Sequence, residues 1–108
     1  MPTIRPKIWI YNSMGSPIKE VPTIKYAYPL ALHKTFAEEK YYKTYTITHI
    51  ITGLSVIRSI AALEDAEMIF ERISTPNIID CWLDVELHRR FLHELIEPFQ
   101  AFSSSKFT

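Results

Sequence analysis

The sequence predicts an α+β domain: an antiparallel sheet of three or four strands with two or three helices packed on one of its faces. Three observations predict it. Residues 1–60 carry β-branched and aromatic runs that alternate with polar residues, residues 61–102 carry apolar residues at helical spacing, and 108 residues is the length of one domain. We expect a single domain over 1–108, mainly strands over 1–60, mainly helices over 61–102, and a frayed polar tail over 103–108.

The first predicted strand spans residues 6–11, where Ile8 and Ile10 alternate with Lys, Trp and Tyr. This period of two is typical of a strand that buries one face. Residues 12–17 collect Asn, Ser, Gly and Pro, which favours a loop.

A second extended stretch covers residues 23–28 and is interrupted by Pro29, because proline offers no N–H to a strand ladder. Residues 30–35 either continue this strand after a bend, as an edge strand, or form a strand of their own. Residues 36–40 then indicate a loop or a single helical turn.

The strongest local signal is a β-hairpin with arms 45–51 and 54–60, in which β-branched residues dominate. Its turn is either two residues long or a four-residue loop with Gly53 in the left-handed conformation, and both have the same parity. That parity places one mainly apolar set of side chains on one face, namely Tyr45, Ile47, Ile51, Leu54, Val56 and Ile60. His49 and Arg58 share this face, and the opposite face carries Thr46, Thr48, Ser55 and Ser59.

Two helical segments follow. The first begins near Ala62 and has acidic residues in its first turn, where the helix dipole favours them. Its apolar face is formed by Leu63, Ala66, Ile69, Phe70 and Ile73. A short helical turn near Trp82 leads into a second helix, which Pro98 stops or kinks. The expected apolar face of the second helix consists of Leu87, Phe91, Leu92, Leu95 and Ile96.

The net charge of zero conceals an asymmetry between the two halves of the chain. Residues 1–60 hold eight basic and three acidic residues, or +5, and residues 61–108 hold four basic and nine acidic residues, or −5. Such an asymmetry suggests contact with a polyanion through the basic half, although mutual attraction or independent solvation of the halves accounts for it without any partner.

The sequence contains no catalytic or metal-binding motif. His88 and His93 are five residues apart and therefore do not share a helix face, and Cys81 has no partner cysteine for a disulfide or a zinc site. Cys81 is expected to be a small apolar residue beside Trp82. His49 is expected to be a hydrogen-bonded core or rim residue, the alternative being a polar site on the sheet with Arg58 and His33. We therefore expect no enzyme activity, no cofactor and no metal.

No secretory signal or apolar run of about 18 residues is present, so we expect no membrane span and a cytoplasmic protein. A single thiol suits a reducing compartment.

The run from His33 to Thr35, the hairpin segment Thr48-His49-Ile50-Ile51-Thr52-Gly53 and the segment Leu63–Ala66 together resemble small uncharacterised phage and plasmid proteins. In these proteins a THxxTG hairpin precedes a helix that opens with an acid-alanine pair. The resemblance covers residues 30–75. It implies a mobile-element setting, in which inhibitors of host defence are common, and a cytoplasmic location in the host cell; it assigns no residue a role.

Two functions of different class remain. The first is a non-enzymatic protein-binding module, such as a phage-encoded inhibitor or adaptor of a host defence complex, because tyrosine is enriched at binding hot spots. The alternative is nucleic-acid binding, because lysines neutralise phosphates and aromatic rings stack on bases. A second copy of the chain is a further candidate partner. In each case the candidate surface is the basic, tyrosine-rich sheet half, with Lys25, Tyr26, Tyr28, Lys40, Tyr41, Tyr42, Lys43, His49 and Arg58.

Overall fold

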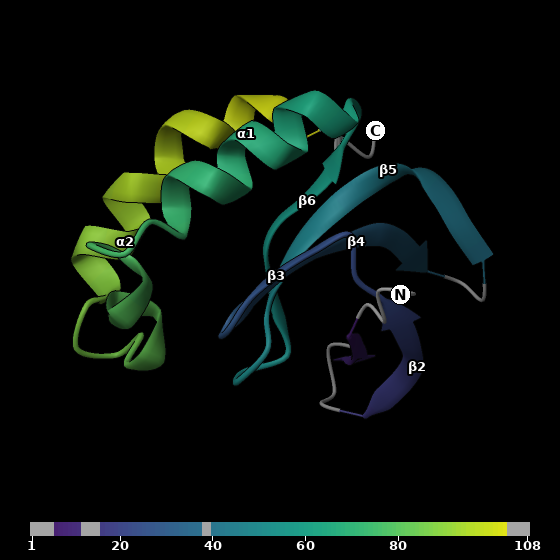
Figure 1. Ribbon diagram of the computed structural model, residues 1–108, viewed down its shortest axis with the longest axis horizontal. Coiled ribbons are helices and arrows are strands. Elements are labelled where there is room, and N and C mark those ends of the chain that lie inside the picture. The colour runs from purple at the N-terminus through teal and green to yellow at the C-terminus, as the bar shows by residue number, and fades with distance from the viewer. Residues whose placement is uncertain (1–5, 12–15, 38–39, 104–108) are drawn as a thin grey trace, which may run out of the picture.

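The computed structural model describes residues 6–11, 16–37 and 40–103. They form a four-stranded antiparallel sheet, with helices on one face and a separate two-stranded sheet on the other side (Figure 1). The α+β class is therefore confirmed, and the predicted frayed tail from residue 104 onward lies outside the described residues. No helix among the described residues is both long and apolar enough to cross a membrane.

The strands are β1 (Lys7–Tyr11), β2 (Pro17–Pro22), β3 (Lys25–Ala27), β4 (Leu30–Ala37), β5 (Lys40–His49) and β6 (Leu54–Ile60). The α-helices are α1 (Leu63–Ile73) and α2 (Arg89–Ile96), and the 3₁₀ helices are η1 (Ile79–Leu83) and η2 (Glu97–Phe102). The larger sheet has the order β3-β4-β5-β6, and the smaller sheet is the hairpin β1-β2.

The prediction of one sheet missed strand β2. Its residues lie between Pro17 and Pro22, and a proline at each end of a segment argues against a strand. Here both prolines stand at the strand ends, where the lost N–H costs least. Thr23, the residue directly after β2, joins the chain to the segment before β1. Its backbone N–H and Oγ1 both donate to the carbonyl of Pro6, at 3.0 and 2.8 Å.

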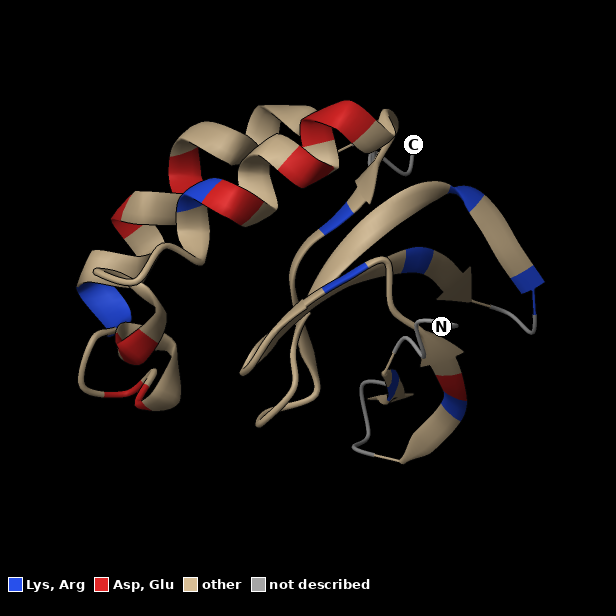
Figure 2. Cartoon of the chain, in the orientation of Figure 1, with Lys and Arg blue, Asp and Glu red and all other residues tan. Residues whose placement is uncertain are grey.

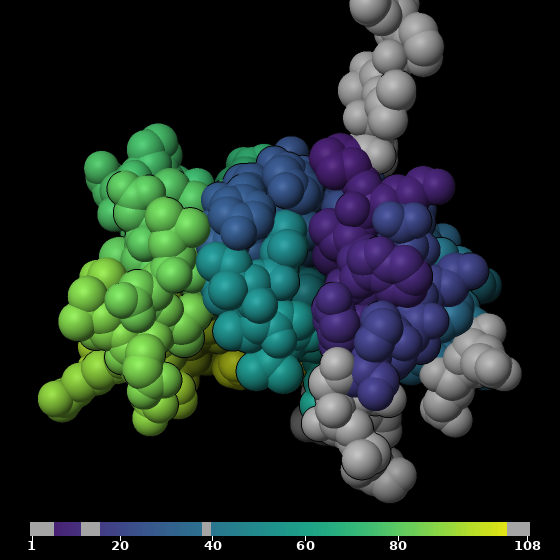
Figure 3. Space-filling view, turned by 90° about the horizontal axis from the view of Figure 1, so that it is seen from below, coloured from purple at the N-terminus to yellow at the C-terminus, as the bar shows by residue number. Residues whose placement is uncertain are grey.

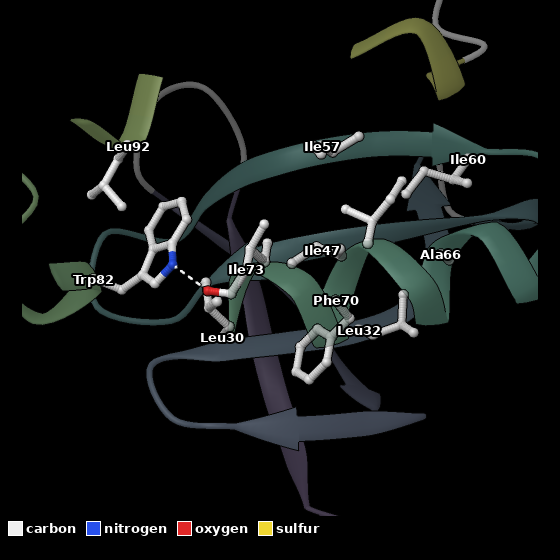
Figure 4. Close-up of a cluster of buried hydrophobic side chains, with 11 residues drawn as sticks. Leu30, Leu32, Ile47, Ile57, Ile60, Ala66, Phe70, Ile73, Trp82 and Leu92 are labelled. Atoms are coloured by element: carbon white, nitrogen blue, oxygen red, sulfur yellow. Dashed lines mark hydrogen bonds between the residues drawn. The ribbon is translucent and has the colours of Figure 1, made fainter. Parts of the chain in front are cut away.

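The main core lies between α1 and the four-stranded sheet (Figure 4). Strands β4 and β5 contribute Leu30, Leu32 and Ile47, each with no exposed surface. From α1, four of the five predicted apolar residues are buried, whereas Leu63 at the helix start is 36% exposed. The full cluster consists of Leu30, Leu32, Ile47, Ile57, Ile60, Ala66, Ile69, Phe70, Ile73, Trp82 and Leu92.

The opposite face of the four-stranded sheet is only partly covered. The β1-β2 hairpin packs a second, smaller cluster against it, formed by Ile8, Ile10, Val21 and Ala31. Toward β5 and β6 this face carries hydroxyl groups instead of aliphatic side chains. The sheet therefore has one continuously apolar face and one mixed face.

The β5-β6 hairpin has the predicted turn but not the predicted register. Residues 50–53 form a four-residue loop, with Gly53 at φ 75° and its N–H bonded to the carbonyl of His49 at 2.8 Å. His49 pairs with Leu54 directly across this loop, whereas two bulges beyond Thr48 make Ile47 pair with Ile57 and Tyr45 with Ile60. Ser59, at φ 61°, lies in the bulged stretch opposite residues 45–47.

The bulges change the face of the sheet on which Arg58 lies. Ile57 and Ile60 both reach the main core although they are three residues apart, and Arg58 lies on the other face. The expectation that His49 and Arg58 share a face is therefore wrong, since each bulge adds a residue and reverses the parity beyond it.

The second helix is shorter than predicted. α2 begins at Arg89 and buries Leu92, while Leu87 and Phe91 are 75% and 46% exposed. The Asp84 carboxylate accepts from the N–H of Leu87 at 3.0 Å, which holds the preceding residues in a turn outside the helix. The prediction that Leu87 and Phe91 join the buried apolar face is thus wrong.

Candidate functional site

The nine side chains predicted to form one binding surface fall into separate groups. Lys25, Tyr26 and Tyr28 lie on and just after β3, where both tyrosines are about half exposed. The Lys25 ammonium forms an ion pair with Glu71 of α1 at 3.4 Å, so this lysine faces the acidic helix.

Lys40, Tyr41, Tyr42 and Lys43 form a second group at the start of β5. The Lys40 ammonium lies 4.9 Å from the centroid of the Tyr42 ring, which is cation–π geometry. Tyr41 packs edge-on against Phe36 at 4.9 Å between ring centroids. Tyr41 also lines an open hollow of about 680 Å³ between β2 and the start of α1.

These two groups lie on different strands, β3 and β5, with β4 between them. Tyr26 pairs with Ala31 and Lys40 with Ala37, an offset of six residues along β4, or about 20 Å at roughly 3.3 Å per residue, whereas Lys25 and Tyr41 are offset by four residues. Figure 2 shows most acidic residues on the helices and basic residues spread over the strands, although β2 also carries Glu20 and the helices carry Arg72 and Arg89. The predicted surface residues are thus divided between β3 and β5, with β4 between them.

His49 is a buried structural residue, 4% exposed, on the helix side of the sheet. Its Nε2 lies 2.6 Å from the carbonyl of Trp82, which only accepts, so Nε2 carries the hydrogen. Its Nδ1 accepts from the backbone N–H of Thr52 at 3.3 Å and lies 2.9 Å from the Thr52 hydroxyl. The ring thus joins the β5-β6 turn to η1.

Trp82 in turn donates from Nε1 to the carbonyl of Ile73 at 2.9 Å, closing the end of α1 (Figure 4). The THxxTG residues His49, Thr52 and Gly53 therefore build a turn and its contact with the C-terminal half. Cys81, beside Trp82, is only partly buried against the same core.

Arg58 lines a cavity of about 370 Å³ between the β1-β2 hairpin and the mixed face of the sheet. His33 lines the same cavity, so the structure brings together two of the three residues considered for a polar site and excludes His49. The remaining lining is contributed by Ile10, Tyr11, Ile18, Thr35, Phe36, Ala37, Thr46, Thr48, Gly53 and Ser55.

His33 is 2% exposed, and both of its ring nitrogens are bonded. Nδ1 lies 2.8 Å from the carbonyl of Lys34 and therefore donates, which leaves Nε2 to accept from the Thr48 hydroxyl at 2.7 Å. Burial lowers the pKa of His33 below its ordinary value of 6.5, and the hydrogen bond to the Lys34 carbonyl opposes this shift. The ring is therefore neutral near pH 7.

A second feature is an exposed apolar area at one end of the sheet, which we call the end surface. It consists of Tyr28, Ile51, Leu54, Leu83 and Leu87, each at least half exposed. Seen end-on in Figure 3, the β3-β4 turn (blue), the β5-β6 turn (teal) and the segment around η1 (green) lie side by side. Two hydrogen bonds join them, from Ile50 N–H to the Pro29 carbonyl at 2.8 Å and from His49 to Trp82.

Sequence reasoning missed the end surface because it treated Leu87 as a core residue and placed Ile51 and Leu54 on the buried hairpin face. The described residues contain no group of three or more His, Cys, Asp or Glu side chains that could hold a metal ion. No protein-family model, no curated protein and no solved structure matches the chain.

Proposed function

We propose that the protein is a non-enzymatic protein-binding module that binds its partner through the end surface. The observation that carries the proposal is the exposure of large apolar side chains on three neighbouring segments (Figure 3), with Leu54 and Leu87 at 64% and 75% and Ile51 and Leu83 at 50% each. Large exposed apolar patches mark interaction sites more often than ordinary surface does.

The end surface is also held rigidly. His49 fixes the β5-β6 turn to Trp82, and Pro29 fixes it to the turn that carries Tyr28. Side chains on a rigid backbone lose little conformational freedom on binding, which favours affinity. Tyr28 adds an aromatic anchor of the kind that hot spots use.

Acidic residues border the apolar side chains of the η1 segment. Asp80, Asp84 and Glu86 are all exposed, but Glu86 forms an ion pair with Arg89, so Asp80 and Asp84 supply the acidic border. The fitting partner therefore presents an apolar centre with lysines or arginines at its rim. The resemblance of residues 30–75 to phage and plasmid proteins supports a host protein of a defence complex as this partner, bound in the host cytoplasm by an inhibitor or adaptor.

The test compares three tagged forms of the full chain in a host-cell lysate: the wild type, the double variant Leu54→Ser with Leu87→Ser, and Leu63→Ser. Leu63 is the matched control, since it is an exposed leucine at the start of α1. We expect wild type and control to retain a stoichiometric partner that the double variant loses, with affinity reduced at least about tenfold for two hot-spot leucines.

Circular dichroism establishes that all three forms are folded. Recovery of the same partner at the same level by the double variant would refute the proposal, and so would a wild type that retains no stoichiometric protein.

The nucleic-acid alternative has less support in the geometry. The lysine-tyrosine groups lie on two strands with β4 between them, and Lys25 already pairs with Glu71. The observation in its favour is the cluster of Lys40, Tyr41 and Lys43 at the exposed start of β5. Salt-dependent oligonucleotide binding that Lys40→Glu with Lys43→Glu abolishes would favour this alternative over the end surface.

A further inference from the structure

The cavity between the β1-β2 hairpin and the mixed face of the sheet has a polar floor and an apolar wall. Thr46 and Thr48 of β5 and Arg58 of β6 form part of the floor, and Ile10 and Phe36 contribute to the wall. Its volume of about 370 Å³ falls within the range of small-molecule sites, about 300–1,000 Å³. It shares no residue with the end surface.

The three linked hydroxyl groups of Thr35, Thr44 and Thr46 retain one unused hydrogen. Thr44 donates to Thr35 at 2.9 Å, and the hydroxyls of Thr35 and Thr46 are bonded at 2.7 Å. Three hydroxyls supply three hydrogens, and these two bonds use two of them. The third belongs to Thr35 or to Thr46, and both line the cavity, so either arrangement leaves a hydroxyl hydrogen for a ligand.

The cavity also carries a positive charge. The guanidinium group of Arg58 has no hydrogen-bond or ion-pair partner among the described residues, although Arg58 lines the cavity. The Lys19 ammonium lies 5.7 Å from the centroid of the Phe36 ring, another lining residue. No aspartate or glutamate is among the described residues that line the cavity.

Donors without a carboxylate select against cations and favour an anion, because a guanidinium group binds the two oxygens of a carboxylate or phosphate in parallel. The aliphatic and aromatic wall favours a ligand with an apolar body, because contact between the two removes apolar surface from water. We propose that this cavity binds a small organic anion, with its carboxylate or phosphate at Arg58 and its apolar or aromatic body against Ile10 and Phe36.

The experiment titrates the full chain, by calorimetry and by ¹⁵N NMR, with phenyl phosphate and benzoate as organic anions. Inorganic phosphate tests the charge alone, and benzyl alcohol tests the body alone. We expect saturable binding of an organic anion, at least about tenfold tighter than of inorganic phosphate or benzyl alcohol, with shifted amides on β5, β6 and β1.

Two variants locate the binding. Arg58→Gln should weaken the organic anion about tenfold or more, the range for a lost charge-assisted hydrogen bond. Arg72→Gln makes the same change on the exposed surface of α1 and should leave the affinity unchanged. Ser55→Ala, an exposed cavity residue whose change leaves the core intact, should weaken binding severalfold.

Three results would overturn the inference. One is no saturable binding of either organic anion at roughly 10 mM, where a site with a Kd near 1 mM is about 90% filled. Another is equal loss in Arg58→Gln and Arg72→Gln, which indicates nonspecific charge attraction. The third is an affinity for inorganic phosphate or for benzyl alcohol equal to that for the organic anions. Equal binding of phosphate would show that the apolar body is not recognised, and equal binding of benzyl alcohol would show that the charge is not recognised. Since the cavity and the end surface share no residue, none of these results bears on the protein-binding proposal.

Discussion

The two faces of the four-stranded sheet are built from the same strands but differ in chemistry. Toward α1, β4 and β5 present Leu30, Leu32 and Ile47, which are fully buried. Toward the β1-β2 hairpin, the intervening residues His33, Thr46 and Thr48 are also at most 5% exposed, yet they are polar. The polar face is tolerated because its groups bond one another, and the described part of the chain has no buried side-chain N or O atom without a partner. One face stabilises the fold, and the other holds positioned polar groups beside a cavity.

Truncation of an aliphatic side chain on each face is the sharpest way to break this comparison. Ile47→Ala on the helix face should lower the free energy of unfolding by about 3–5 kcal/mol, because the residue is fully buried in the large cluster. Ile10→Ala in the four-residue cluster under the hairpin should cost nearer about 2 kcal/mol, because that smaller cluster relaxes more readily into the space. Urea denaturation measures both. Equal losses would show that the two faces contribute equally to stability.

The next largest expected loss of stability concerns His49, the polar contact on the helix face. His49→Ala removes the donor to the Trp82 carbonyl and the acceptor of the Thr52 N–H, so we expect a loss of about 1–3 kcal/mol. His93→Ala is the matched control, because His93 is exposed on α2 and should change stability by less than about 0.5 kcal/mol. If both substitutions cost the same, His49 does not hold the turn in place.

The smallest expected effect is the pH dependence of stability that His33 on the polar face causes. Burial lowers the pKa of His33, so between that lowered pKa and 6.5 the unfolded chain binds more protons than the folded one. The stability that the neutral ring contributes is complete above about pH 6.5 and is lost as the pH falls toward and through the folded-state pKa.

We therefore expect the free energy of unfolding to fall more steeply in the wild type than in His33→Gln on acidification from about pH 7.5 to about pH 5. Urea denaturation at each pH measures it, and the other histidines of the four contribute to both proteins alike. Parallel pH profiles would mean that His33 is not the group that titrates.

Sequence reasoning succeeded where a single periodicity decides the structure. The apolar spacing of α1 and the Gly53 turn were predictable because each depends on residues close in the chain. The β5-β6 register was not, since two bulges interrupt it, the first opposite Ile47 and Thr48 and the second including Ser59 at positive φ, a conformation that serine rarely adopts. Without the first bulge, Arg58 cannot be placed on the face of His33.

The end surface escaped prediction for a different reason. Leu87 and Phe91 continue a helical apolar pattern, and the pattern alone does not reveal that α2 begins only at Arg89. The pairing of His33 with Thr48 likewise depends on the β4-β5 register, which a bulge after Lys34 alters. Local sequence patterns therefore predicted the type of each helix and strand better than they predicted which of its faces packs against the rest of the protein.

The turn between β5 and β6 has a consequence for how the chain folds. Three distant segments meet there: the ring of Tyr11 lies against Gly53, the carbonyl of Pro29 binds Ile50, and the carbonyl of Trp82 binds His49 across 33 residues. Each contact closes a long loop and costs chain entropy before its stabilisation is gained. We therefore expect the turn to be fully stabilised only when the N-terminal hairpin, the sheet and the η1 segment are assembled, since an excised hairpin of residues 45–60 lacks all three supports.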